Sequence, residues 1–411
     1  MLLASARSAR ALEYTVALGV RCATVLLAVA AVAAPVRPAA SAPGAAALRA
    51  SGLDHYYNLE YDAAIADFHQ LVALQPDSAA AWNHLSQAIL YREMYRIGAL
   101  QSQLYGHGDP FLQQKLLPPD PAEVKAFDDA NQKALSLSES AVAHQPNDAH
   151  AHYDEGVAYA LRGTLEFSVQ SSYFSALGDA KRARREAESA SRLDPAFVDP
   201  KLILGTHNYI AGSLPWTARI FSSLIGYSGD KELGRSQVEF VSTHGENSQT
   251  DATVLLVVMD RRDGLNQQAA SLLRGLVVRY PRNVLLAVEE AEAWEAAGSH
   301  DQALAAYRAV VAHAAGHAPG YQRAPLDKVW YDLGNIERLY SHWQLAARDY
   351  EQIESLPHPR TRYLQAGSLA AGEVELRAGD PLEAQKQFTR CRDIDPHSPA
   401  GEAAIRELAH Q

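Results

Sequence analysis

The strongest constraint on the fold is a spaced set of four residues that recurs along the chain. Gly372, Ala384, Phe388 and Pro396 are separated by 12, 4 and 8 residues, and the same spacing begins at Gly52. A short repeated unit cannot bury its apolar face alone, so it packs against the next copy and produces an elongated array. The 411 residues also exceed a single compact core, which stops growing at roughly 250–300 residues. We therefore expect stacked repeats.

Each of these residue types has a packing role in a pair of antiparallel helices. The small residues let the two helices approach closely, the aromatic residue fills the space between repeats, and the proline ends the second helix. The pattern resembles the tetratricopeptide repeat, which has about 34 residues. No competing period-2 strand pattern is present. We predict an all-α fold, a tetratricopeptide-type α-solenoid of about seven irregular helix pairs, with clear copies beginning at residues 45, 250, 284, 327 and 365.

Spacing between the copies predicts the organisation of the solenoid, which we expect at residues 45–411. Residues 45–245 read as irregular repeats with insertions, 246–398 as regular repeats, and 399–411 as a capping helix that opens with a first-turn proline. A Gly- and Pro-rich stretch at 105–121 interrupts one unit. It is either a lid or second contact surface, or an ordinary insertion.

Residues 202–241 depart from the repeat pattern. Ser213, Leu214 and Pro215, followed by Gly226, Tyr227, Gly229, Asp230 and Gly234, resemble a segment of the eukaryotic tetratricopeptide repeat protein 39 family and its fungal inclusion-clearance relatives. The resemblance implies a helical, non-enzymatic, adaptor-like protein. The residues themselves predict two short helices joined by a Gly-Asp turn, with Asp230 capping the helix that begins at Lys231.

The first 33 residues have the pattern of a signal peptide. Arg7, Arg10 and Arg21 precede an apolar run at residues 22–34, which is too short for a spanning helix of about 18–20 residues. An Ala/Pro-rich tether follows at 34–44. We expect an exported protein, periplasmic or secreted. The alternative is an uncut segment that anchors the chain in a membrane.

The charge balance bears on the class of partner. The chain carries 48 Asp and Glu against 37 Lys and Arg, a net charge of −11. Phosphate recognition needs a surface rich in Lys and Arg, so nucleic acid is an unlikely partner on these grounds.

Residue sets that carry catalysis or bind metals do not converge in this sequence. Ser299, His300 and Asp301 are adjacent, so their side chains diverge and cannot form a triad. His150 and His152 point away from each other on a helix, whereas zinc needs three or four convergent ligands. Cys391 falls at a packed position, where a buried inert thiol is expected. We predict no catalytic residues, no metal and no cofactor.

The first helix of each repeat lines the concave side of such a solenoid, at repeat positions 2, 5, 9 and 12. Aromatic and amide side chains there suit an extended peptide or a partner helix. The candidate groove residues are Arg49, Tyr56, Asn83, Gln87, His150, Tyr153, Lys328, Tyr331, Asn335 and Arg338.

These features predict a non-catalytic scaffold or adaptor that binds a protein or peptide in its groove. One alternative is a structural envelope protein that assembles with itself. The other is a hydrolase that uses carboxylates on one helix. For those carboxylates a solvated face is the simpler expectation. They are Glu289, Glu290, Glu292 and Glu295.

Overall fold

The computed structural model describes residues 44–100, 116–213 and 228–410, and all regular structure in these ranges is α-helical. Residues 45–411 form one compact unit. The signal peptide, the tether up to residue 43 and most of the 105–121 insertion lie outside the described residues. Within the described ranges, we find no helix long and apolar enough to cross a membrane.

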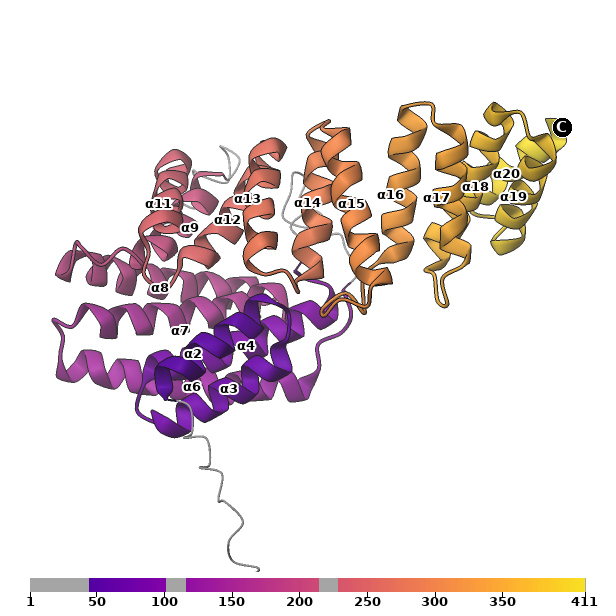
Figure 1. The fold of residues 1–411 in the computed structure, drawn as a ribbon. Coiled ribbons are helices and arrows are strands. Elements are labelled where there is room, and N and C mark those ends of the chain that lie inside the picture. The colour runs from indigo at the N-terminus through magenta and orange to yellow at the C-terminus, as the bar shows by residue number, and fades with distance from the viewer. Residues whose placement is uncertain (1–43, 101–115, 214–227, 411) are drawn as a thin grey trace, which may run out of the picture. The chain divides into compact units, whose positions relative to one another are not determined.

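The first half of the unit consists of four helix pairs (Figure 1). In each pair the second helix packs against the first and the next pair follows in chain order. The pairs are α2 (Ala45–Tyr57) with α3 (Tyr61–Leu74), α4 (Ala79–Ile97) with α6 (Pro121–His144), α7 (Ala149–Ser168) with α8 (Tyr173–Leu193), and α9 (Pro200–Gly212) with α11 (Lys231–His244).

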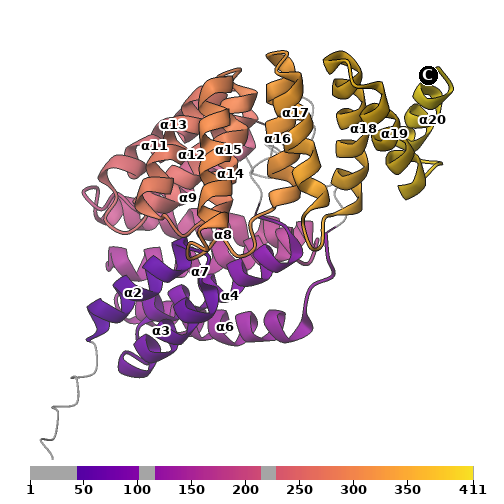
Figure 2. The same ribbon diagram turned by 45° about the vertical axis from the view of Figure 1, so that its right-hand side comes forward.

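The second half continues with four more pairs and a last helix, in the order seen in Figure 2. The last helix packs on both members of the final pair, where a capping helix would lie. These elements are α12 (Gln249–Arg262) with α13 (Asn266–Arg279), α14 (Val284–Ala296) with α15 (His300–Ala315), α16 (Leu326–Leu339) with α17 (Trp343–Glu354), α18 (Thr361–Ala378) with α19 (Pro381–Ile394), and α20 (Pro399–His410).

The predicted tetratricopeptide-type solenoid is confirmed, and the packing reason for its motif is visible. A Cβ atom added at Gly52 would lie 2.5 Å from the Phe68 ring, and one at Gly372 would lie 2.5 Å from the Phe388 ring. Phe388 is completely buried. The first helix must therefore carry a small residue where the aromatic ring of the second helix crosses it.

The described residues contain eight adjacent helix pairs, one more than the rough number predicted. The additional pair is α9 with α11, which come together closely because both carry glycine at their crossing: a Cβ on Gly234 would lie 2.3 Å from the backbone nitrogen of Tyr209. The predicted cap is confirmed, since the Asp230 carboxylate accepts a hydrogen bond from the backbone N–H of Leu233 at 3.0 Å.

Cys391 is fully buried on α19, next to α20, as its position in the repeat predicts. Its Sγ lies 3.4 Å from the carbonyl oxygen of Ala400. Burial raises the pKa of this thiol to about 11, so it stays protonated and unreactive at neutral pH.

Candidate interaction surfaces

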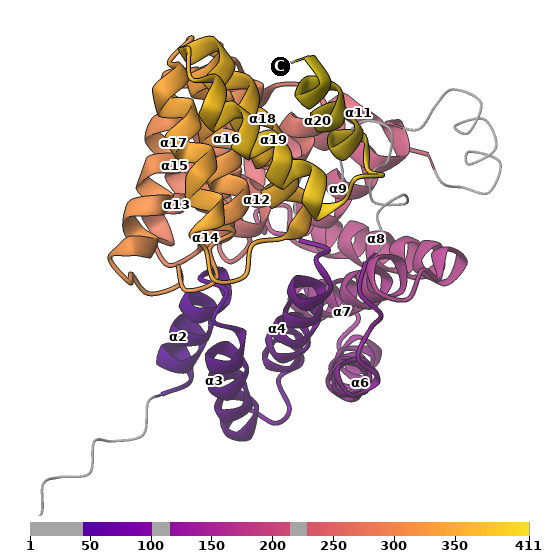
Figure 3. The ribbon, with the colours of Figure 1, turned by 90° about the vertical axis from the view of Figure 1, so that its right-hand side faces the viewer.

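The first repeat contacts a part of the chain more than two hundred residues away. Helix α2 lies against the turn that joins α13 to α14 (Figure 3), and the Tyr57 ring lies 4.9 Å from the ring of Tyr280. The Asn283 side chain donates a hydrogen bond of 2.7 Å to the carbonyl oxygen of Tyr57. We call the contacts of α2, α4 and α7 with residues 245–251 and 280–283 the N-terminal closure.

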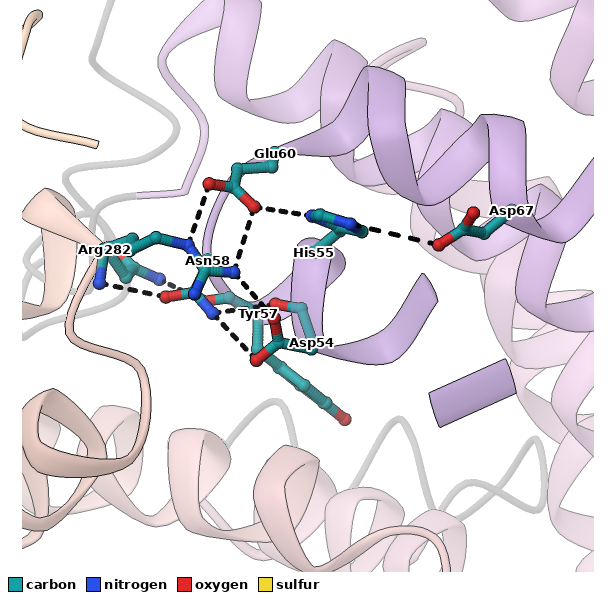
Figure 4. Close-up of polar contacts among 8 residues, drawn as sticks. Asp54, His55, Tyr57, Asn58, Glu60, Asp67 and Arg282 are labelled. Atoms are coloured by element: carbon teal, nitrogen blue, oxygen red, sulfur yellow. Dashed lines mark hydrogen bonds and ion pairs between the residues drawn. The ribbon is translucent and has the colours of Figure 1, made fainter. Parts of the chain in front are cut away.

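Arg282 forms the outer part of this closure (Figure 4). Its guanidinium donates to Glu60 at 2.9 Å and to Asp54 at 2.6 Å, and its backbone N–H donates to the Asn58 side chain at 3.0 Å. Burial acts to raise the pKa of Glu60, but hydrogen bonds from Arg282 and His55 hold that pKa below its usual value. The ion pairs therefore persist well into the acid range.

Asp251 forms the inner part. Asp251 is partly buried, and its carboxylate accepts hydrogen bonds from Tyr57 of α2 and Gln87 of α4. Burial raises the pKa of Asp251 to about 6, and the nearby Asp199 carboxylate adds to the shift. Asp199 itself accepts backbone hydrogen bonds from Glu246 and Asn247 at 2.8 and 3.0 Å.

The six candidate groove residues of the first half are engaged in these and neighbouring contacts. Tyr56 is 5% exposed, and its ring lies 5.4 Å from that of Tyr91. Gln87 donates to Asp251, and the Tyr153 hydroxyl lies 2.9 Å from that of Ser248. Arg49 bonds to the Asn247 side chain at 3.4 Å, and Asn83 donates to the Asp154 carbonyl oxygen at 2.9 Å. The His150 ring lies tilted against that of Phe197, with 4.4 Å between the ring centres.

The four candidate groove residues of the second half lie together on α16. The Tyr331 ring lies 5.7 Å from that of Tyr363 on α18, and Arg338 pairs with Glu373 of α18 at 3.0 Å. Asn335 accepts a hydrogen bond of 2.8 Å from the Tyr350 hydroxyl. Tyr331, Asn335 and Arg338 are partly exposed, so these side chains form a continuous surface across two repeats.

Lys328 is more deeply placed than its three neighbours. Its Nζ lies 2.7 Å from Glu292 of α14 and 2.5 Å from Asp332, whose side chains are 9% and 12% exposed. Burial acts to lower the pKa of Lys328, but the two carboxylates raise it above its usual value. This lysine therefore joins two repeats as a charged structural group.

The expectation of a solvated carboxylate face on α14 is wrong. Glu289, Glu290 and Glu292 are 5%, 8% and 9% exposed. Glu290 accepts hydrogen bonds from Arg274 at 3.0 Å and from the Trp294 indole at 3.2 Å, and Glu295 accepts one from the Tyr307 hydroxyl at 2.9 Å. Cations and hydroxyls from neighbouring helices make this burial tolerable.

Sequence reasoning missed Arg282 and Asp251 as contact residues. Asp251 stands at repeat position 2 of the copy that begins at residue 250, and Glu292 and Glu295 stand at positions 9 and 12 of the copy that begins at residue 284. Reading repeat positions 2, 9 and 12 in these two copies would have identified all three residues as groove candidates. Nothing in the motif pointed to Arg282, because its partners come from the first repeat.

The part of the chain that the structure describes holds no group of three or more His, Cys, Asp or Glu side chains placed to bind a metal ion. His152 hydrogen-bonds to Glu186 at 2.8 Å and is buried, which is a packing role.

These features define a helical-repeat protein of the α-solenoid class. Residues 49–92 and 260–319 match the family model described as tetratricopeptide repeat, so these two stretches of the chain are tetratricopeptide repeats. Repeats of this type typically mediate protein–protein interactions. No curated protein matches the chain.

Solved structures similar to this chain include repeat proteins of several kinds. The APC/C hetero-tetramer Cut9–Hcn1 matches with 13% identity over 88% of this chain and 55% of that chain, at a TM-score of 0.39. Yeast Tom70 matches with 14% identity over 89% and 95%, at 0.33. A tetratricopeptide repeat protein from Parabacteroides merdae matches with 11% identity over 89% and 98%, at 0.26. The chain spans about half of the first of these proteins. We transfer no function at this level of likeness.

Proposed function

We propose that this protein is a non-catalytic scaffold that binds a protein or peptide partner on the α16–α18 surface, defined by Tyr331, Asn335, Arg338 and the neighbouring α18 side chains. The observation that supports it is the contrast between the two halves. In the first half, Arg49, Gln87 and Tyr153 bond to the chain's own Asn247, Asp251 and Ser248. By contrast, Tyr331, Asn335 and Arg338 contact only side chains of α17 and α18 in the described interactions, and they are partly exposed.

The chemistry of this surface suits an extended peptide or a helix with mixed polarity. Tyr331 supplies an aromatic face, Asn335 supplies an amide, and Arg338 is 37% exposed although it pairs with Glu373. Partly exposed Leu369 and exposed Leu376 on α18 add apolar area. Aromatic and arginine side chains supply most of the binding energy at protein interfaces.

Affinity capture with matched variants tests this proposal. The chain is cross-linked in an extract of its source, and the proteins that co-purify are identified by mass spectrometry. The double variant Tyr331→Ala/Arg338→Ala should lose a specific partner. Gln344→Ala/Arg348→Ala, two exposed positions on the neighbouring α17, should keep it. Equal capture by both variants would remove the α16–α18 surface as the binding site.

We also propose that the protein is exported, in the periplasm or outside the cell, either released or held by an uncut N-terminal segment. The support is the pattern of arginines followed by an apolar run at residues 22–34. N-terminal sequencing of the protein recovered from its source tests this. Cleavage near residue 33 would support release, an intact N-terminus in a membrane fraction would support anchoring, and an intact chain in the cytosol would refute export.

We also propose that residues 202–241 are similar to a segment of the tetratricopeptide repeat protein 39 family. This proposal rests on the sequence alone, from Ser213 to Gly234.

A further inference from the structure

The N-terminal closure joins segments that are far apart in sequence. Asp54 and Arg282 are 228 positions apart, whereas most helix contacts in the unit join neighbouring helices. A repeat array is held mainly by contacts between neighbours. The closure can therefore open while every helix and every neighbouring pair stays folded, and opening exposes both Arg282 and Asp251 to water.

We propose that the N-terminal closure is a pH-sensitive conformational device. Mildly acidic solution holds α2 and α4 against residues 245–251, and neutral to alkaline solution loosens them. This device involves the conformation of the first repeats, so its pH response does not depend on partner binding at the α16–α18 surface.

The direction of the pH dependence follows from the surroundings of Asp251 in the closed and in the open state. In the closed state its carboxyl is partly buried between α2, α4 and α12 and its pKa is about 6, against an ordinary value of 3.8. In the open state it is hydrated and returns to its ordinary value. Closing is therefore coupled to proton uptake, and linkage predicts a closed-to-open ratio about tenfold higher at pH 5 than at pH 8.

The other groups that face Asp251 either do not titrate in this range or act in the same direction. Tyr56 and Tyr57 of α2 and Tyr153 of α7 have pKa values raised by burial, so they stay neutral. Gln87 of α4 has no charge to lose. Asp199 at the start of α9 repels the ionised form of Asp251 and so favours proton uptake.

Further charged or titratable groups near the closure include His84, Asp154 and Arg282. Burial lowers the pKa of His84 on α4 to about 4, so it is neutral above pH 5. Burial raises the pKa of Asp154 on α7 to about 7, which adds to acid stabilisation. The Arg282–Glu60 ion pair persists across this range because the pKa of Glu60 lies below its usual value. This ion pair therefore stabilises the closed state equally from pH 5 to pH 8, whereas the contributions of Asp251 and Asp154 change with pH.

Hydrogen–deuterium exchange on the full chain at pH 5, 6, 7 and 8, with labelling times corrected for intrinsic exchange, measures the opening. Amides of α2 should lose at least about tenfold of their protection between pH 5 and pH 8. Asp251→Asn preserves the shape and both hydrogen bonds but cannot ionise, so the pH dependence should become about tenfold smaller. The dependence that remains belongs to Asp154, whose pKa of about 7 gives it the larger share.

Two further variants distinguish titration from damage. Tyr57→Phe removes a hydrogen bond that lowers the pKa of Asp251, so the midpoint of the protection curve should move to higher pH. Asp349→Asn on α17 is the matched control, because Asp349 also has a pKa of about 6 but lies outside the closure. It should leave the α2 profile unchanged. A wild-type profile without pH dependence, or the same dependence in Asp251→Asn, would overturn the proposal.

Discussion

Replacing Lys328 by methionine should destabilise the second half of the solenoid strongly. Met fills most of the same volume but removes the cation that lies 2.7 Å from Glu292 and 2.5 Å from Asp332. Removing one partner of a buried ion pair costs about 3–5 kcal/mol, because it leaves uncompensated buried charge. Lys328 keeps 24% of its side chain exposed, so water reaches the network and we expect about 2–4 kcal/mol.

The pH dependence of this effect provides a second check. Burial raises the pKa of Asp332 above its usual value even with Lys328 nearby. Without Lys328 that pKa rises further, so the cost should be greatest at neutral pH and should shrink as the freed carboxylates take up protons in acid. The variant should therefore gain stability relative to wild type between pH 7 and pH 5.

Urea unfolding combined with hydrogen exchange of α14 and α16 measures the effect, because repeat arrays need not unfold in one step. Lys386→Met is the control: Lys386 is 72% exposed and pairs with Glu383 at the surface, where water screens the ion pair, so stability should change little. The role given to Lys328 would be refuted if the two variants lost the same free energy of unfolding, or if the loss in Lys328→Met did not change with pH.

Three further outcomes follow from buried groups. Phe388→Ala should cost about 3–5 kcal/mol in urea unfolding, because the ring is fully buried against Gly372, and a loss below about 1 kcal/mol would contradict that packing. Cys391 should resist iodoacetamide at pH 8 until urea unfolds the chain, and rapid alkylation of the folded protein would contradict its burial. Burial raises the pKa of Asp349 to about 6, so Asp349→Asn should stabilise the protein at pH 8 by about 1–2 kcal/mol and by less at pH 5; a loss of stability at pH 8 would contradict this.

The fold was predictable because its determinants are local. The spacing of Gly52 to Phe68, and of Gly372 to Phe388, encodes a contact within one helix pair, so a single repeat contains the information. Asp230 likewise caps a helix three residues downstream. The number of pairs was less certain, since α9 and α11 cross through glycines without the usual motif.

The surroundings of the candidate groove residues were not predictable in the same way. Arg49 and Tyr153 occupy groove positions in the repeat register, yet they contact Asn247 and Ser248, and no periodic pattern encodes contacts across 198 and 95 residues. Charge on a helix was also misread. Glu290 and Glu292 suggested a solvated face, but their partners Arg274 and Lys328 come from neighbouring repeats.

Site-specific photo-cross-linking tests the central claim most directly. A photoreactive residue at Leu376, an exposed position on α18 next to the Arg338–Glu373 pair in the repeat register, is compared with one at Arg348, exposed on α17. The account predicts that the same protein partner is cross-linked from position 376 and not from 348, and that Tyr331→Ala/Arg338→Ala abolishes the product. Cross-linking from 348 alone, or a product from 376 that the double variant leaves intact, would contradict it.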